Sequence, residues 1–390
     1  MEELREQMKA QLQLVSEGFV RYLHDEVDWE AQLIAILGAR GVGKTTMLLQ
    51  HIKRYNALED TLFVYADNIY FTQHTLFDLA FEFYKNGGRH LYIDEIHKYK
   101  NWSQEIKNIY DSLPRLQVIY TGSSILDLEQ GGADLSRRKL QYYMYGLSFR
   151  EYLQLKHNTV VPVHKLEDLI QNNIRFPHSD LQPLPAWKSY VQTGYYPFFM
   201  KGNYLQLLNG VMLQTVENDI PMFAGLSMGV ARKLKTLLYI IAQSVPFKPN
   251  MSAIAADLGI SRNDVGDLFF YLEKAGLINQ LRSDITGIRL LGKVDKVYLN
   301  NTNLMYAIAG GNTDIGNERE TAFYTLARVT DPVTTSSVSD FQIGDYTFEV
   351  GGKKKGRKQI EDVENGIVVK DDIEYGSKGI VPLWAFGLMY

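Results

Sequence analysis

The sequence of 390 residues contains no cysteine. This absence excludes disulfides, iron–sulfur clusters, thiol nucleophiles and zinc sites built from cysteine. Long apolar runs are lacking too, since stretches such as LIAIL at 33–37 are far shorter than the roughly 20 residues that cross a bilayer. The first residues, MEELREQMKAQLQLV, are charged and amphipathic, without the apolar core of a signal peptide. We therefore expect a cytoplasmic protein that does not associate with membranes.

A strong charge of either sign is also missing. The formal net charge is −4, and the 45% hydrophobic and 22% charged residues are ordinary values for a globular protein. The whole-chain charge therefore does not call for a nucleic acid or a membrane, and any site for a polyanion must be a local patch. The length suits two to four domains. The eight histidines form no metal-ligand spacing, and no HExxH, GxSxG or GxGxxG motif occurs.

A glycine-rich motif is the most specific feature of the chain. Residues 33–53, LIAILGARGVGKTTMLLQHIK, pass from a short apolar run through glycines into helical periodicity. The glycines let several backbone N–H groups turn toward phosphate oxygens, and the start of the following helix adds a positive field. We expect Lys44 to reach the β- and γ-phosphates and the Thr45 hydroxyl to bind magnesium. The predicted ATP-binding residues are Gly38, Gly41, Gly43, Lys44, Thr45 and Thr46.

An acidic pair follows a second short apolar run in RHLYIDEIHKYKNW at 89–102. Asp94 is expected to hold Mg²⁺ together with Thr45, and Glu95 to orient or deprotonate the attacking water. His90 and His97 flank this strand and are more typical of polar strand ends than of catalysts.

A third strand is predicted in QVIYTGSSI at 117–125. Ligands of parallel sheets lie beyond the carboxyl ends of the strands. Ser123, or Ser124, is therefore a candidate sensor of the γ-phosphate. The alternative is a serine that caps the following helix, and the sequence does not decide between them.

Four segments resemble the AAA+-type ATPases of an archaeal and bacterial family with an associated carboxyl-terminal domain: GARGVGKTT, YIDEIHKYKNW, VIYTGSSILDL and RRKLQYYMYGLSFREYL. A weaker likeness extends through YVQTGYYPFF at 190–199, where Thr193 replaces a glycine usual in the family. The resemblance implies ATP and Mg²⁺ as cofactors and a homo-oligomer, a hexamer by AAA+ analogy. It also implies an arginine finger that reaches a neighbouring subunit. Arg138 matches that position best, Arg137 precedes it, and an ordinary surface pair is the alternative.

The segment 252–278, SAIAADLGISRNDVGDLFFYLEKAGLI, has the pattern of a helix-turn-helix. Gly259 is expected to make the turn, and Ser261 with Asp264 to form a capping box. Alternating residues follow as a β-wing would, which resembles a winged helix, a fold used mostly for duplex DNA. The second helix is net acidic while the wing is basic, so both DNA contact and a structural role stay open.

The carboxyl-terminal region contains a hairpin signal in SVSDFQIGDYTFEV, with Gly344-Asp345 as the turn. Setting Ile343 opposite Tyr346 places Asp340 opposite Glu349. Opposed like charges destabilise a hairpin unless they bind a cation or are partly protonated.

With Glu320 added, the acids resemble the PD-(D/E)XK nuclease core and form a candidate second metal site. Gly351 stands where that core has lysine, and Lys353 is the nearest lysine. An active nuclease, a degenerate DNA-binding fold and a scaffold remain alternatives, since Glu320 also suits a helix cap with Asn317. The basic stretch GGKKKGRK at 351–358 is the best phosphate-binding patch in the chain.

The expected fold class is α/β. We expect four domains. The first is an AAA+-like P-loop ATPase domain at 1–155, with a parallel sheet flanked by helices, and the second is a helical lid at 156–240. The third is a winged helix at 241–305, and the fourth is a small nuclease-like α/β domain at 306–390.

The predicted function is ATP hydrolysis coupled to DNA binding or remodelling, with Glu95, Lys44, Arg138 and Ser123 in the catalytic machinery. The alternatives are a nucleotide-switched signalling ATPase and a Mg²⁺-dependent nuclease regulated by ATP.

Overall fold

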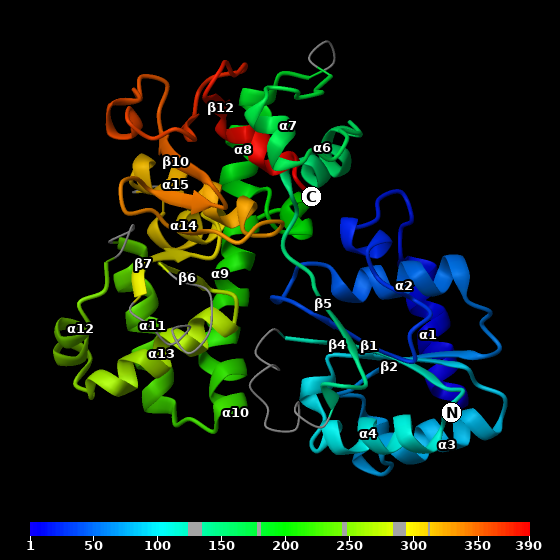
Figure 1. Ribbon diagram of the computed structural model, residues 1–390. Helices are drawn as coiled ribbons and strands as arrows, with labels where there is room; N and C mark the ends of the chain where they lie inside the picture. Colours follow the sequence, from blue (N-terminus) through cyan, green and yellow to red (C-terminus); the bar gives the residue numbers. More distant parts are fainter. Residues whose placement is uncertain (124–134, 178–180, 244–247, 284–293, 311–312) are drawn as a thin grey trace. The chain divides into compact units, whose positions relative to one another are not determined.

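The computed structural model describes residues 1–123, 135–177, 181–243, 248–283, 294–310 and 313–390. The chain divides into two compact units, Met1–Tyr145 and Gly146–Tyr390 (Figure 1). Each unit is described by itself. None of the helices within the described ranges combines the length and the apolar character needed to cross a bilayer.

Unit 1 is built on a five-stranded sheet in the order β2-β3-β4-β1-β5. All of its neighbouring strands run parallel. Strands β1 to β4 are almost fully buried, as their continuous apolar runs predict, whereas the edge strand β5 is half exposed. The strands are β1 (Leu33–Leu37), β2 (Thr61–Tyr65), β3 (His90–Asp94), β4 (Gln117–Gly122) and β5 (Leu140–Tyr143).

Helices cover both faces of this sheet. Helix α2 lies on one face, and α3 and α4 lie together on the other (Figure 1). Helix α1 packs on the edge strand β2 and on α2 through its buried residues Leu4, Met8 and Leu12, which recur at helical spacing. The helices are α1 (Glu2–Leu14), α2 (Lys44–Tyr55), α3 (Leu76–Lys85) and α4 (Trp102–Ser112). The predicted parallel sheet flanked by helices is confirmed.

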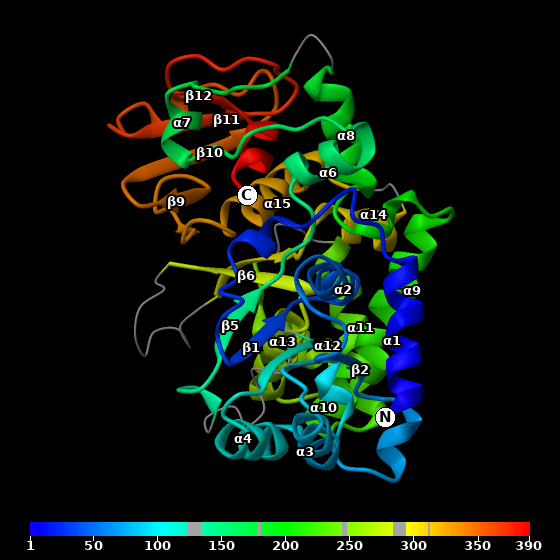
Figure 2. The same cartoon turned by 90° about the vertical axis from the view of Figure 1, so that its right-hand side faces the viewer.

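Unit 2 begins with helices and ends with a second sheet (Figure 2). A π-helical stretch, Thr215–Asp219, joins α9 to α10. The helices are α6 (Phe149–His157), α7 (Leu166–Ile170), α8 (Pro183–Thr193), α9 (Tyr204–Gln214), α10 (Ile220–Ala224), α11 (Met228–Gln243), α12 (Met251–Leu258), α13 (Arg262–Lys274), α14 (Thr302–Ala309) and α15 (Ile315–Ala327).

Helices α12 and α13 form the predicted helix-turn-helix pair. Helix α12 ends at Gly259, whose φ of 61° is left-handed, and the capping box of Ser261 and Asp264 begins α13. The antiparallel hairpin of β6 (Ile278–Arg282) and β7 (Val294–Leu299) follows. The expected turn, cap and hairpin are confirmed, while the interpretation as a DNA-binding winged helix stays a prediction.

The second sheet has the order β12-β11-β10-β9-β8. Its β9–β10 hairpin has the predicted register, with Ile343 opposite Tyr346 and Phe341 opposite Phe348, and Gly344 has a left-handed φ of 53°. Strands β10, β11 and β12 pair in parallel. The strands are β8 (Thr334–Thr335), β9 (Phe341–Ile343), β10 (Tyr346–Gly351), β11 (Gly366–Lys370) and β12 (Ile380–Pro382).

A buried network of amides and tyrosines holds unit 2 together. Asn303 accepts hydrogen bonds from the Tyr195 N–H at 2.8 Å and the Tyr204 hydroxyl at 2.6 Å. Its own amide group donates to the carbonyls of Tyr190 and Val191. The YVQTGYYPFF segment thus has a packing role, because it is tied to the start of α14 by buried and fully paired polar groups.

Both ends of unit 2 pack together. Helices α6, α7 and α8 contact the 3₁₀ turn Leu383–Leu388, and the Arg150 Nε donates to the Tyr390 carbonyl at 3.1 Å. The division of this unit into a lid, a winged helix and a nuclease-like domain stays a prediction, as does the predicted boundary at residue 155.

Candidate active site

The loop between β1 and α2 has the backbone that its glycines predict. Gly41 and Gly43 have φ values of 86° and 102°, a left-handed region that favours glycine. Gly38 is needed for another reason, because a Cβ there would lie 2.3 Å from the Met144 carbonyl oxygen. Helix α2 starts at Lys44 with no side chain capping its N-terminus. Its first N–H groups are therefore oriented as a phosphate site requires.

Lys44 lies folded onto its own loop. Its Nζ donates to the carbonyl oxygens of Gly38 at 2.8 Å and Ala39 at 3.0 Å, and the side chain is buried. Burial lowers the pKa of Lys44, and the carboxylates of Glu95 and Asp94 oppose that shift. The ammonium group is thus held at the inner side of the phosphate loop.

Arg21 supports the same loop, a contact that the sequence did not suggest. Its buried guanidinium donates to the carbonyl oxygen of Val42 within the loop and, at 2.9 Å, to that of Tyr145 after β5. The segment before β1 is thereby fixed to the loop and to the end of the edge strand.

Asp94 and Thr45 meet as predicted. The Thr45 Oγ1 donates to Asp94 Oδ2 at 2.7 Å, and Thr121 donates to the other carboxylate oxygen. Asp94 is only 2% exposed, and burial raises its pKa although the hydrogen bonds from Thr121 and Thr45 act to lower it. A hydroxyl and a carboxylate oxygen are ligands that Mg²⁺ prefers, so these residues fit the ion that a nucleotide brings.

Glu95 follows at the end of β3 in a left-handed conformation, with φ of 55°. Its N–H donates to Thr121 Oγ1 at 3.0 Å. Lys98 Nζ lies 3.3 Å from its carboxylate and 2.6 Å from that of Asp67. Burial acts to raise the pKa of Glu95, but His97, Lys44 and Lys98 outweigh it and lower that pKa. Glu95 is therefore ionised and paired with the Lys98 ammonium group.

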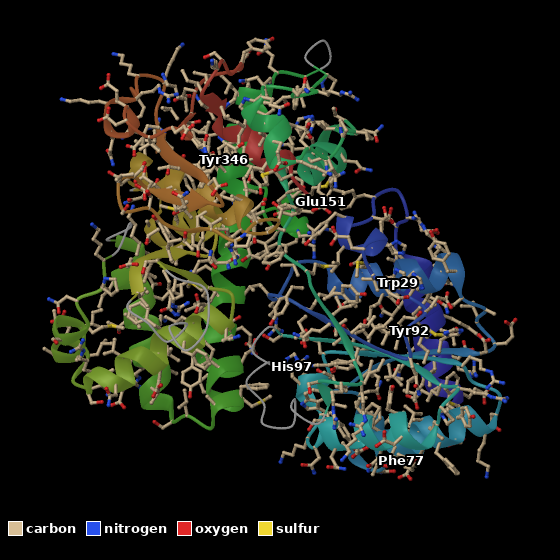
Figure 3. All side chains as sticks on the ribbon, in the orientation of Figure 1. Trp29, Phe77, Tyr92, His97, Glu151 and Tyr346 are labelled. Atoms are coloured by element: carbon tan, nitrogen blue, oxygen red, sulfur yellow. The ribbon has the colours of Figure 1, made fainter. Side chains whose placement is uncertain are left out.

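His97 lies beside Glu95 and is contacted by Ser123. The His97 Nε2 is 3.8 Å from the Glu95 carboxylate, and its Nδ1 accepts from the Ser123 N–H at 3.5 Å (His97 is labelled in Figure 3). The side chain of His97 is buried in the 3₁₀ turn Ile96–Lys98 that follows β3, and its interpretation as a polar strand end stays a prediction. The alternative sensor, Ser124, lies outside the described residues.

The two arginines of the predicted finger differ. Arg138 forms a two-point ion pair with Asp111 of its own unit, at 3.0 and 3.2 Å, whereas Arg137 is exposed. Thr46, the last predicted ATP-binding residue, is exposed next to the buried Lys44 and the half-buried Thr45.

Unit 1 also contains an aromatic cluster around His51, in the third turn of α2. His51 stacks on Trp29 with ring centroids 3.7 Å apart, and its Nδ1 lies 3.2 Å from His24 Nε2. Tyr92 lies beside it, and Trp29 and Tyr92 are labelled in Figure 3. Burial, followed by the neighbouring His24 and His90, lowers the pKa of His51 to about 3. His51 is therefore neutral at physiological pH.

The three acids of the predicted second metal site lie in unit 2 and each has a protein partner. Lys296 lies between Glu320 and Asp340, while Glu349 pairs with Lys355 and accepts from Ser339. The lysine that reaches Glu349 is thus Lys355 rather than Lys353. Within the described ranges, no group of three or more histidine, aspartate or glutamate side chains is arranged to hold a metal ion.

Comparison with known proteins agrees with the fold of unit 1. Residues 30–153 match the model of the AAA domain, and residues 185–315 match a domain of unknown function (DUF8612). An uncharacterized protein of Methanocaldococcus jannaschii, MJ1637, is 28% identical over 295 residues, which cover 70% of this chain and 61% of that protein. This chain therefore spans about three fifths of that relative.

Solved structures give a more distant likeness. AMPPCP-bound DnaA from Aquifex aeolicus has a TM-score of 0.27 and 15% identity, with 69% of this chain and 86% of that chain covered. The S. cerevisiae Hsp104-ADP complex has a TM-score of 0.27 and 16% identity, with 69% and 39% covered. TM-scores this low carry no argument about function. The AAA-domain match and the parallel sheet give the fold class, an AAA+-type P-loop NTPase, and support ATPase activity.

Proposed function

We propose that this protein hydrolyses ATP in unit 1 and couples hydrolysis to DNA binding or remodelling. The observation that carries the ATPase proposal is the convergence of Lys44, Thr45, Asp94 and Glu95 at the carboxyl ends of β1 and β3. A phosphate loop, a hydroxyl–carboxylate pair and a second ionised carboxylate are the groups that hydrolysis of a phosphoanhydride requires.

Each residue has a role that follows from its position. Lys44 exchanges the carbonyls of Gly38 and Ala39 for the β- and γ-phosphate oxygens when nucleotide binds. Thr45 and Asp94 hold Mg²⁺, which when bound neutralises phosphate charge. Glu95, with its pKa held low, accepts hydrogen bonds from the attacking water and orients it.

Ser123 is suited to sense the γ-phosphate, with His97 between it and Glu95. The hydrogen bond from the Ser123 N–H to His97, and the closeness of His97 to Glu95, give a continuous polar path. A change at the phosphate end of β4 would therefore be felt at the carboxylate that orients water.

The ATPase proposal is tested with Lys44→Ala and Glu95→Gln. Lys44→Ala should abolish nucleotide binding, measured by calorimetry. Glu95→Gln should bind ATP normally but hydrolyse it more slowly by a factor on the order of 10² or more, because this group acts only in the transition state. Lys53→Ala on the same helix and Glu82→Gln on α3 are the matched controls. Normal hydrolysis by Glu95→Gln would remove Glu95 from the catalytic role.

The DNA proposal is supported by a basic loop in unit 2. Lys353, Lys354, Arg357 and Lys358 are exposed between β10 and β11, with no acidic residue among 351–358. Counterion release at such a loop gives affinity for a phosphate backbone without sequence preference. The helix-turn-helix pair with its basic hairpin is a second surface of the right shape.

The steady-state ATPase rate should rise when single-stranded, duplex or four-way-junction DNA is added at moderate salt. The double variant Lys353→Ser with Lys354→Ser should bind DNA more weakly, by the same factor for every DNA sequence. The slope of the logarithm of the DNA association constant against the logarithm of the salt concentration should become smaller by about 2. The control is the double variant Lys165→Ser with Lys201→Ser, at two other exposed lysines of unit 2. It should change neither the DNA affinity nor its salt dependence. A rate indifferent to all three DNAs would favour the nucleotide-switched signalling ATPase.

We further propose that the active form is a homo-oligomer, a hexamer by AAA+ analogy, with Arg137 as the finger. Arg138 is engaged by Asp111 within its own chain, while Arg137 is exposed beside it. Arg137→Ala should therefore lower turnover without changing ATP affinity or the molar mass measured by light scattering. A monomer at all nucleotide concentrations would contradict the proposal.

A further inference from the structure

An ammonium group lies between the two acids that the nuclease resemblance assigns to a metal ion. Lys296 projects from β7, and its Nζ is 3.2 Å from Glu320 Oε2 and 3.4 Å from Asp340 Oδ1. All three side chains are about 15% exposed. The two acids come from α15 and from the residue before β9, so three separate elements converge on this cation.

Each of the two acids also accepts a hydrogen bond from a fixed protein donor. The Tyr298 hydroxyl donates to Glu320 Oε2 at 2.7 Å, and the Val350 N–H donates to Asp340 Oδ2 at 3.0 Å. Lys296 further lies over the Phe341 ring, 5.8 Å from its centroid. Each acid is therefore held by the shared ammonium group and by one further protein donor, which offsets the cost of its burial.

The third acid of the set is neutralised in the same way. Glu349 is 1% exposed and pairs with Lys355, and it accepts from the Ser339 hydroxyl. A Cβ at Gly351 would lie 2.7 Å from the Lys355 side chain, so Lys355 fills the volume where a side chain at 351 would begin. The opposed acids of the hairpin thus each have a lysine, and they do not share one ion.

We propose that Lys296 is a resident cation that takes the place of a divalent metal ion between Glu320 and Asp340. Mg²⁺ needs carboxylate oxygens at about 2.0–2.1 Å in octahedral geometry. It cannot bind here while the ammonium group and its hydrogen bonds persist. The acids and the metal implied by the resemblance therefore do not fit one another, and this site supports the fold without cutting DNA.

Access is not what keeps a metal ion away. Lys296 and Asp340 line an open cleft of about 1060 Å³, together with hydroxyl side chains of Thr334–Ser339. A hydrated ion can reach Asp340 through this cleft, and the lysine charge opposes its binding. Removing that charge should therefore turn the same residues into a divalent-cation site.

The test counts Mn²⁺ ions bound per full-length chain, from the EPR signal of free Mn²⁺ without nucleotide. Lys296→Met should bind one more ion than the wild type, with a dissociation constant on the order of 10⁻⁴ M, and Lys296→Met with Asp340→Asn should lose it again. Lys248→Met, at an exposed lysine lining the same cleft, is the matched control and should gain none.

Wild type and Asp340→Asn should bind equal numbers of ions, a comparison that does not depend on how Lys296→Met folds. An Asp340-dependent ion in the wild type would overturn the proposal, and so would Asp340-dependent DNA cleavage in Mg²⁺. Circular dichroism and an unchanged ATPase rate would show that Lys296→Met is folded. If this folded variant bound no additional ion, the proposal would be overturned as well.

Discussion

Thr121, at the end of β4, links the two acids of the candidate active site and gives the sharpest prediction. Its hydroxyl donates to Asp94 and accepts the Glu95 N–H at 3.0 Å, and the residue is fully buried. Thr121→Val keeps the shape of the side chain and removes both hydrogen bonds. Asp94 then loses a donor in a site where burial already raises its pKa, and the Glu95 N–H is left without its acceptor.

The size of the effect follows from these two contacts. A hydrogen bond to a charged group contributes about 1.5–3 kcal/mol, and each 1.4 kcal/mol is a factor of ten. We therefore expect kcat/KM for ATP to fall by roughly 10- to 100-fold in Thr121→Val. The acid limb of the pH–rate profile should also move to higher pH, because a donor that lowers the pKa of Asp94 is gone. The assay is steady-state ATP hydrolysis with Mg²⁺ titrated at each pH.

Thr61→Val is the matched control, since Thr61 is buried at the start of β2, at the opposite ends of the strands. It should hydrolyse ATP at the wild-type rate. If Thr121→Val stays within twofold of the wild type with an unshifted acid limb, Thr121 does not position these acids and the reasoning is refuted.

Three further predictions concern stability and charge. Lys98→Met should shift the acid limb of hydrolysis to higher pH, because Lys98 helps to lower the pKa of Glu95. In His51→Gln, the free energy of unfolding measured in urea should fall less steeply as pH is lowered than in the wild type. The reason is that a His51 pKa of about 3 costs the folded state roughly 1–2 kcal/mol between pH 7 and pH 5, after allowance for solvent screening. Asn303→Leu should lower the free energy of unfolding by about 3–5 kcal/mol, because the buried Tyr195 N–H and Tyr204 hydroxyl lose their acceptor.

The sign of the His51 effect is fixed by the direction of its shift. A histidine whose folded pKa lies below its unfolded value contributes stability above about pH 6.5, and that contribution is lost as pH falls toward 3. An unchanged pH slope in the variant would contradict the assignment. Asn263→Leu, at an exposed position on α13, is the control for Asn303 and should change stability by less than about 0.5 kcal/mol.

The phosphate loop and the acidic strand were predictable because their signals are local. Glycines at fixed spacing determine the turn, and an apolar run followed by Asp94 and Glu95 determines where a buried strand ends. The hairpin register around Gly344 was predictable for the same reason, since the turn type sets which residues face each other.

Apart from the Thr45–Asp94 pair, the partners of these residues could not be predicted, because they come from distant segments. Thr121 reaches Asp94 only through the pairing of β4 beside β3, and Arg21 reaches the loop from before β1. Lys296 lies 24 residues from Glu320 and 44 from Asp340, with no spacing that marks it. Such contacts depend on the tertiary arrangement, which no short pattern in the sequence specifies.

The closure of unit 2 on itself has a kinetic consequence. Arg150 near its beginning and Tyr390 at its end are 240 residues apart in sequence and share a hydrogen bond. Contacts this distant form late, because a long loop must be ordered before they stabilise anything. Unit 1 is a compact unit that ends at Tyr145, so we expect it to fold while the ribosome is still making the remainder. Refolding experiments should therefore resolve a fast phase for the parallel sheet and a slower one for unit 2.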